Sequence, residues 1–216
     1  MTQDTIPLRR TQYYHLTDIF AVLKQYSAHN YLVGGCVRDY MMEKDFKDLD
    51  IVTEAPIEKS KPAFKKAGWK VDETGEKFLV LSISKDHEQY EVANFRKDGV
   101  YLDGRRPESV EIGTLEEDAK RRDFTVNALY LDFESGETFD PNGTGLEDLN
   151  KRVLRFIGRP KDRIKEDYLR VFRFYRFLTK GFKPHIGSLR ACREYFNEAY
   201  PKITPERVRG ELEKMI

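Results

Sequence analysis

Cysteine and tryptophan are scarce in this sequence, whose 216 residues contain two cysteines and one tryptophan. Cys36 and Cys192 are far apart and form no CxxC pair, which argues against a disulfide framework and a cysteine-rich zinc site. No apolar run approaches the roughly 18 residues that span a bilayer, and residues 1–10 lack the apolar centre of a signal peptide. We therefore expect a cytoplasmic protein.

Net charge is also nearly absent, at +1, but the charges are unevenly distributed. Residues 1–150 have a balance of −9, whereas residues 151–216 have a balance of +10. A basic helical segment is either a solvated face or a surface that meets phosphate. The 39% of hydrophobic residues and 12% of aromatic residues are enough for a core, which excludes general disorder.

Apolar periodicity predicts an α/β fold with a mixed sheet over residues 1–150, followed by helices over residues 151–216. Helical spacing occurs at 14–27, 37–42, 56–68 and 115–122, and strand-like alternation at 31–33, 48–53, 78–84, 90–95, 128–133 and 137–139. Residues 97–113 have no apolar period and are expected to form a long functional loop. The last helical pattern reaches Ile216 without a capping residue, so we expect a chain shortened from a longer protein.

Two aspartates, Asp48 and Asp50, lie two residues apart in the alternating segment DLDIV. Side chains at positions i and i+2 of a strand point to the same face, so these carboxylates are expected to lie together. Two such groups repel each other unless a cation lies between them, and Mg²⁺ takes a few carboxylates together with water and substrate phosphate. An acidic pair on a solvated surface strand is the alternative.

Gly34 and Gly35 precede a helical segment, as in loops where the backbone approaches a phosphate closely. Arg38 lies in the first turn, where the helix dipole slightly disfavours a cation, and this placement makes sense if Arg38 meets a triphosphate. Glu91, in the segment YEVANFR, is expected to add a third acid from a neighbouring strand. A simple tight turn and an edge-strand glutamate are the alternatives.

The segments LVGGCVRD and DLDI resemble the nucleotidyltransferase signature of the bacterial tRNA CCA-adding enzyme and poly(A) polymerase family, within the DNA polymerase beta-like superfamily. YEVANFR with DGRRP, RRDFTVNAL and EDYLRVFRFYRF match further family segments in the same order. The resemblance implies a catalytic head over residues 1–150 and a nucleobase-recognising, RNA-facing neck over residues 151–216, truncated before the family's body and tail. One departure is Glu43, where the family often has glycine.

The resemblance also implies roles for the segment around Arg122. Asp123 and Asn127 would take the ribose hydroxyls of a nucleotide, and Arg122 would meet phosphate. A 2′-hydroxyl both donates and accepts, so an Asp/Asn pair can distinguish ribose from deoxyribose. A solvated helix end is the alternative for this charged cluster.

The helix expected from Glu166 would carry the base-reading residues. Asp167 would accept a hydrogen bond from the exocyclic amine of cytosine or adenine, and Arg170 would donate to the adjacent ring nitrogen. Arg173 and Arg176 would hold Asp167 or the triphosphate. An intrahelical ion pair between Asp167 and Arg170 is the alternative.

The resemblance implies an enzyme that adds C, A or both from CTP and ATP to an RNA 3′ end, with tRNA as the expected acceptor, and releases pyrophosphate. Asp48 and Asp50 would bind Mg²⁺, with Glu91 assisting. Poly(A) addition, a nucleotide- and RNA-binding module with little activity, and transfer to a small molecule or protein are the competing hypotheses.

Overall fold

The computed structural model describes residues 8–46 and 48–215. Its strands are β1 Asn30–Val33, β2 Asp50–Thr53, β3 Lys70–Asp72, β4 Val80–Lys85, β5 Glu88–Asn94, β6 Arg96–Asp98, β7 Val110–Ile112, β8 Tyr130–Leu131, β9 Thr138–Phe139, β10 Val153–Leu154 and β11 Lys183–Pro184. Its α-helices are α1 Arg10–Lys24, α2 Gly35–Met41, α3 Ile57–Lys66, α4 Leu115–Arg121, α5 Gly145–Asn150, α6 Pro160–Glu166, α7 Leu169–Thr179, α8 Ile186–Ala199 and α9 Pro205–Glu213. Short 3₁₀ turns occupy Glu76–Phe78, Thr125–Asn127 and Tyr200–Lys202.

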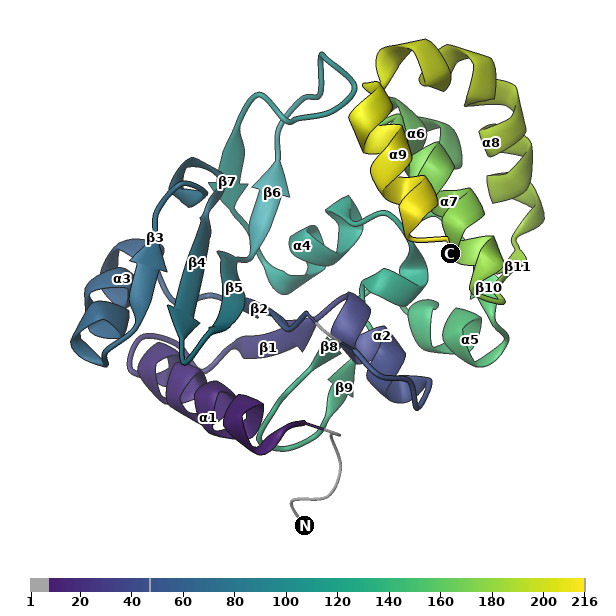
Figure 1. Cartoon of the computed structure of the whole chain (residues 1–216). Helices are drawn as coiled ribbons and strands as arrows, with labels where there is room; N and C mark the ends of the chain where they lie inside the picture. The colour runs from purple at the N-terminus through teal and green to yellow at the C-terminus, as the bar shows by residue number, and fades with distance from the viewer. Residues whose placement is uncertain (1–7, 47, 216) are drawn as a thin grey trace.

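The main sheet has the strand order β3-β4-β5-β2-β1-β8-β9 (Figure 1). β2 and β5 run parallel, and the other neighbouring strands of this sheet are antiparallel. The predicted mixed sheet is therefore confirmed. β4 and β5 form the predicted hairpin, in which both turn residues, Asp86 and His87, have positive φ.

Different helices cover the two faces of the sheet. The apolar stripe of α1, with Leu16, Ile19 and Leu23 fully buried, packs with Ile51 and Val92 in the larger core cluster. On the opposite face, α4 contributes to a second apolar cluster that contains residues of β1, β2 and β8. The edge of the sheet where β1 ends and β2 begins faces the neck helices, and polar residues lie along it (Figure 1).

The neck is joined to the head by a cluster of aromatic rings. Phe124 of the head lies 4.8 Å from Phe156 and 5.5 Å from Phe177, measured between ring centroids. Phe156 in turn stacks on Phe174 at 5.7 Å. These rings are buried and bring α7 against the 3₁₀ turn that follows Phe124. Across the segments that the structure describes, no helix has the length and apolar character to cross a membrane.

The prediction of a loop over residues 97–113 is partly wrong. Residues 96–98 and 110–112 pair as the antiparallel strands β6 and β7, and only the segment between them lacks a ladder. The pairing of β6 with β7 is hard to predict from the sequence, because each strand has only three residues and most of them are polar. The tip of this ribbon reaches the neck, where the Gly104 carbonyl accepts a hydrogen bond from the Tyr168 amide at 3.1 Å.

The single helix predicted from Glu166 is also wrong. α6 ends at Glu166, Asp167 has extended backbone angles, and α7 begins at Leu169. The Asp167 carboxylate accepts a hydrogen bond from the Leu169 amide at 3.1 Å, a local pattern by which short acidic side chains interrupt a helix. α9 likewise ends at Glu213, and Ile216 lies outside the described residues. The division into a head (1–150) and a neck (151–216) stays a prediction.

Candidate functional site

A cavity of about 910 Å³ lies between the head and the neck. All of the nominated site residues except Glu91 line it: Gly34, Gly35, Arg38, Asp48, Asp50, Arg122, Asp123, Asn127, Asp167, Arg170, Arg173 and Arg176. The lining is strongly polar, with acids on the sheet edge and arginines on the helices. The fold therefore brings together residues that are up to about 140 positions apart in the sequence.

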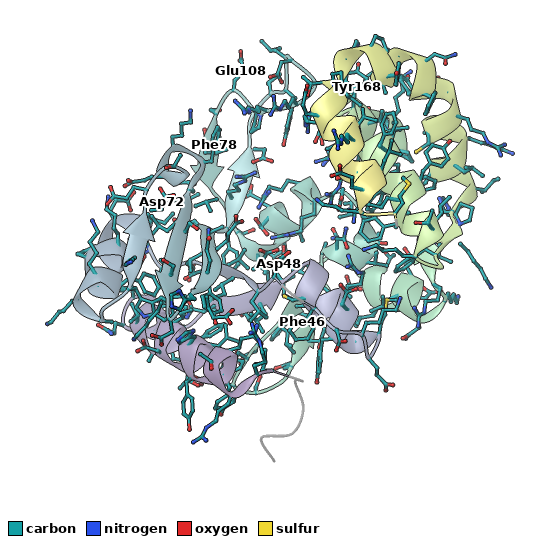
Figure 2. All side chains as sticks on the ribbon, in the orientation of Figure 1. Phe46, Asp48, Asp72, Phe78, Glu108 and Tyr168 are labelled. Carbon is teal, nitrogen blue, oxygen red and sulfur yellow. The ribbon has the colours of Figure 1, made fainter. Side chains whose placement is uncertain are left out.

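Asp48 and Asp50 both face this cavity. Asp48 is exposed and precedes β2, so the prediction that both acids lie within one strand is wrong by two residues, because β2 begins only at Asp50. Figure 2 shows Asp48 near the middle of the molecule, between the strands of the head and the neck helices. The expected common orientation toward a cleft is nevertheless present.

Glu91 is the direct neighbour of Asp50 across the parallel pair of β2 and β5. Burial, followed by the negative charges of Glu91 and Asp48, raises the pKa of Asp50 to about 6, even though the positive charge of Arg122 acts in the opposite direction. The ionised form of Asp50 is therefore disfavoured, and a positive charge placed beside the carboxylate would stabilise it. Glu91 is exposed and does not line the cavity itself.

The acidic pair fits a divalent cation of the oxygen-seeking type. Within the described residues there is no group of three or more side chains arranged as a complete metal cage. Mg²⁺ does not need one, since it keeps several waters and is completed by substrate phosphate. Two cleft-facing carboxylates with a third beside them supply the donor set that such a cation uses.

Gly34 forms the turn between β1 and α2 with φ +78° and ψ −125°, a conformation that side-chain-bearing residues rarely adopt. A Cβ at Gly34 would lie 4.0 Å from Asp50 Oδ2 and 3.6 Å from an Arg122 guanidinium nitrogen. The turn therefore presents bare backbone to Asp50 and Arg122. α2 begins at Gly35, two residues earlier than the sequence predicts.

Arg38 is held in place from three sides. Its guanidinium donates to both carboxylate oxygens of Asp39, at 2.8 and 2.7 Å, and to the Asn127 side-chain oxygen. It also lies over the Phe177 ring, 4.8 Å from the centroid. Arg38 is thus buried and fixed in orientation at the cavity wall, where an arginine meets an anion at little entropic cost.

The cluster Arg121-Arg122-Asp123 is not a solvated helix end, because all three residues are buried or partly buried. Asp118, one turn earlier on α4, accepts from Arg121 at 2.6 Å and from Arg122 at 2.8 Å, and the Tyr130 hydroxyl donates to it at 2.7 Å. Burial alone would raise the pKa of Asp118, but the charges of Arg122 and Arg121 hold it at about 2. The sequence analysis missed Asp118, although its i, i+3 and i, i+4 spacing to the arginines was a usable signal.

Asp123 connects the head to α7. Its carboxylate accepts from Asn127 Nδ2 at 3.0 Å and from Arg173 at 2.7 and 2.8 Å. Burial would raise the pKa of Asp123, but the Arg173 charge and the Asn127 hydrogen bond bring it to about 2. The acid and amide predicted to bind ribose therefore lie together, with their orientation fixed by an arginine of the neck.

Asp167 and Arg170 do not pair with each other, so the alternative of an intrahelical ion pair is wrong. Asp167 accepts from Arg207 of α9 at 3.1 and 3.2 Å. Arg170 donates to Glu166 at 2.6 Å and to the Arg121 carbonyl at 3.1 Å. Both side chains line the cavity with separate supports, which is compatible with one acceptor and one donor being offered side by side.

The last helix of the described chain supplies two residues that sequence reasoning missed. Besides Arg207, Glu211 is buried and accepts from Arg176 at 2.6 Å, with Arg173 at 4.0 Å. Arg173 and Arg176 therefore do not hold Asp167, contrary to one part of the prediction. The spacing of Arg207 and Glu211 on one face of α9 was visible, but nothing local in the sequence pointed to their partners.

The fold and the cleft define an α/β head with a glycine turn beside an acidic pair, closed by a helical neck with fixed arginines. Residues 30–155 match the family model described as the poly A polymerase head domain. The match extends over more than half of the chain, which therefore belongs to this family.

Known relatives agree with this assignment. The CCA-adding enzyme of Enterococcus faecalis is 43% identical over 188 residues, which are 86% of this chain and 45% of that protein. The CCA-adding enzyme of Streptococcus gordonii is 37% identical over 218 residues, covering 100% of this chain and 52% of that protein. The chain thus spans about half the length of the curated relatives that it matches.

Solved structures of similar fold include complexes with nucleotides and tRNA. The Bacillus stearothermophilus CCA-adding enzyme in complex with CTP has a TM-score of 0.79 and 32% identity, covering 96% of this chain and 49% of that chain. A tRNA nucleotidyltransferase complexed with a primer tRNA and an incoming ATP analog has a TM-score of 0.71 and 28% identity, covering 90% and 55%.

Proposed function

We propose that this chain carries the catalytic head and neck of a template-independent RNA nucleotidyltransferase. It transfers C, A or both from CTP and ATP to an RNA 3′ end, with tRNA as the acceptor, and releases pyrophosphate. The observation that supports this most is the position of Asp50 beside the Gly34 turn, within one cleft that the neck arginines also line. The CTP, ATP analog and primer tRNA named for similar structures support the choice of substrates.

The reaction forms a bond between the RNA 3′-oxygen and the α-phosphorus and breaks the bond to the β-phosphate bridging oxygen. Asp48 and Asp50, assisted by Glu91, would hold Mg²⁺ at the sheet edge. A divalent cation bound there lowers the pKa of the attacking hydroxyl and neutralises charge on the leaving pyrophosphate. Gly34, Gly35 and the fixed Arg38 form the wall that receives the phosphates. The burial and the neighbouring acids that raise the pKa of Asp50 disfavour its negative charge, and a bound cation would offset this effect.

The ribose and the base would be bound by the neck side of the cleft. Asp123 and Asn127 offer an acceptor and an amide to the 2′-hydroxyl, which distinguishes ribose from deoxyribose. Asp167 accepts from the exocyclic amine of cytosine or adenine while Arg170 donates to the ring nitrogen. Guanine and uracil would place a carbonyl oxygen against the carboxylate, and such an unpaired contact is strongly rejected.

The test is label transfer from CTP or ATP to a tRNA that ends at its discriminator base, in the presence of Mg²⁺. Asp48→Ala with Asp50→Ala should abolish incorporation while leaving the protein folded, as judged by its thermal unfolding. Full activity of that double variant would refute the assignment of the acids. Nucleotide binding by the unaltered chain without any transfer would instead favour a binding module.

Base choice has its own test. Arg170→Ala should relax the preference for C and A over G and U, because the cleft would lose its donor to the ring nitrogen. Unchanged selectivity would count against the base-reading assignment. A long homopolymeric A product on RNA other than tRNA would favour poly(A) addition as the activity.

A further inference from the structure

Phe177 belongs both to the cleft and to the apolar core. Among the aromatic residues of α7, all of which the structure describes, it alone lines the cleft, yet only 2% of its surface is exposed. The rings of Phe124 and Phe182 meet it at interplanar angles of 70° and 79°, with centroids 5.5 and 6.0 Å away. Such edge-to-face contacts hold an aromatic ring in one orientation. The neck therefore offers the cleft a fixed aromatic ring.

Two arginines of the cleft lie over the Phe177 ring. The guanidinium carbon of Arg38 is 4.8 Å from the ring centroid, and that of Arg176 is 4.7 Å from it. A cation over the face of an aromatic ring is attracted by the partial negative charge of that face. Arg176 is the chain neighbour of Phe177, so its contact is local, whereas Arg38 comes from α2 in the head. Phe174, a buried ring of the same helix, has no such cation over it within the part of the chain that the structure describes, so the arrangement is particular to Phe177.

The hydrogen bonds of Arg38 restrain the edges of its guanidinium group. Nε and one Nη donate to Asp39, and the other Nη donates to Asn127, so that two of the five N–H groups have no acceptor among residues 8–46 and 48–215. Bonds along the edges of a planar group oppose its tilting only weakly, whereas a ring packed against its face opposes the tilt directly. The tilt decides where the two remaining N–H groups point, and Arg38 lines the cleft. The contact with Phe177 therefore controls the direction in which Arg38 offers these donors.

We propose that Phe177 is a positioning residue for the transfer reaction, and that its ring sets the plane of the Arg38 guanidinium for binding the phosphates of the nucleotide. The inference rests on the proposed function, since that function assigns a phosphate to Arg38. An arginine whose orientation is set before binding loses little conformational entropy when it meets an anion. Because the ring belongs to α7 and the arginine to α2, the phosphate contact of the head depends on a residue of the neck.

The test is a binding titration with inorganic tripolyphosphate, which requires no turnover. Phe177→Leu keeps an apolar side chain but removes the aromatic face, and it should weaken binding by about fivefold, because a smaller fraction of Arg38 would have the orientation that binds. Phe177→Met should have the same effect and is the second variant if leucine prevents folding, since methionine adapts to irregular space in a core. The matched control is Phe174→Leu, which makes the same change in the same helix and ring cluster. It should lower the melting temperature as Phe177→Leu does and leave tripolyphosphate binding within twofold of the unaltered chain.

A double-mutant cycle distinguishes positioning from a general loss of structure. In an Arg38→Met background the guanidinium is absent, so Phe177→Leu should weaken tripolyphosphate binding by less than twofold further. A fivefold loss in that background, an equal loss in Phe174→Leu, or no loss in Phe177→Leu and Phe177→Met would each overturn the positioning role while leaving the proposed function intact. No tripolyphosphate binding by the unaltered chain would overturn the phosphate wall of the proposed function, and the role of Phe177 with it.

Discussion

Replacing Asp118 by asparagine tests whether the arginines of the cleft depend on this one buried carboxylate. The side chain is fully buried and accepts from Arg121, Arg122 and the Tyr130 hydroxyl. A pKa of about 2, compared with 3.8 for a free aspartate, corresponds to about 2 kcal/mol of stability at neutral pH. Two guanidinium groups would also lose their counter-charge in a buried place, so the total loss should be roughly 3–5 kcal/mol.

The pH dependence gives the sharper signature of Asp118→Asn. Because the folded pKa is depressed, the stabilisation is present above the unfolded pKa near 4 and is lost as pH falls through about 2. The stability difference between the unaltered chain and the variant should therefore shrink by about 1 kcal/mol between pH 5 and pH 3. The unaltered chain loses this stability, whereas asparagine has no charge to lose.

Urea unfolding followed by circular dichroism at pH 7, 5 and 3 measures this difference. Asp18→Asn is the matched control, since Asp18 also pairs with a cation, Lys85 at 3.1 Å, but both side chains are about one-third exposed or more. It should cost less than about 1 kcal/mol. Equal stability losses in the two variants, or a difference that does not change with pH, would refute the reasoning about Asp118.

Three further substitutions test the shape of the cleft. Gly34→Ala should lower the free energy of unfolding in urea by about 1–3 kcal/mol, because a φ of +78° is strained for alanine. It should also lower nucleotide incorporation. Unchanged stability would show that the backbone at this position is not strained for alanine. Arg207→Gln should change the free energy of unfolding by less than about 1 kcal/mol, because the Arg207–Asp167 pair is partly exposed. It should nevertheless reduce the selectivity for C and A, because Asp167 would lose the partner that orients it. Competition between the four triphosphates measures this selectivity, and an unaltered selectivity would argue against the positioning role of Arg207. Gly104→Ala should detach the β6–β7 ribbon from the neck, because a Cβ would lie 2.5 Å from the Tyr168 ring. Limited proteolysis measures this, and cleavage within residues 99–109 should become faster. Equal resistance of the variant and the unaltered chain would count against the contact.

Local patterns in the sequence predicted the parts of the cleft that depend on near neighbours. Strand alternation placed Asp50 and Glu91 on neighbouring strands, and the glycine pair marked the turn whose φ of +78° needs Gly34. The same holds for the hairpin of β4 and β5. Glu43, where the family often has glycine, indeed has a positive φ of 55° at the turn after α2.

The ion pairs that fix the cleft could not be predicted, because their partners are far apart in the sequence. Asp123 and Arg173 are 50 residues apart, and Asp167 and Arg207 are 40 residues apart. Periodicity identifies which face of α9 is polar, but not which helix it packs against. The break at Asp167 was hidden for a related reason, because a carboxylate that accepts from the following backbone looks like any acidic residue in a helical pattern.

The two walls of the cleft, residues 1–150 and 151–216, are joined at several separate places, among them the ring cluster around Phe124. At a second place Asp123 binds Arg173 of α7, and at a third the ribbon tip at Gly104 rests on Tyr168. Two parts that are joined at three separated places cannot rotate freely about any one of them. These contacts therefore oppose any change in the width of the cleft, and a molecule that binds there has to fit the space that they leave.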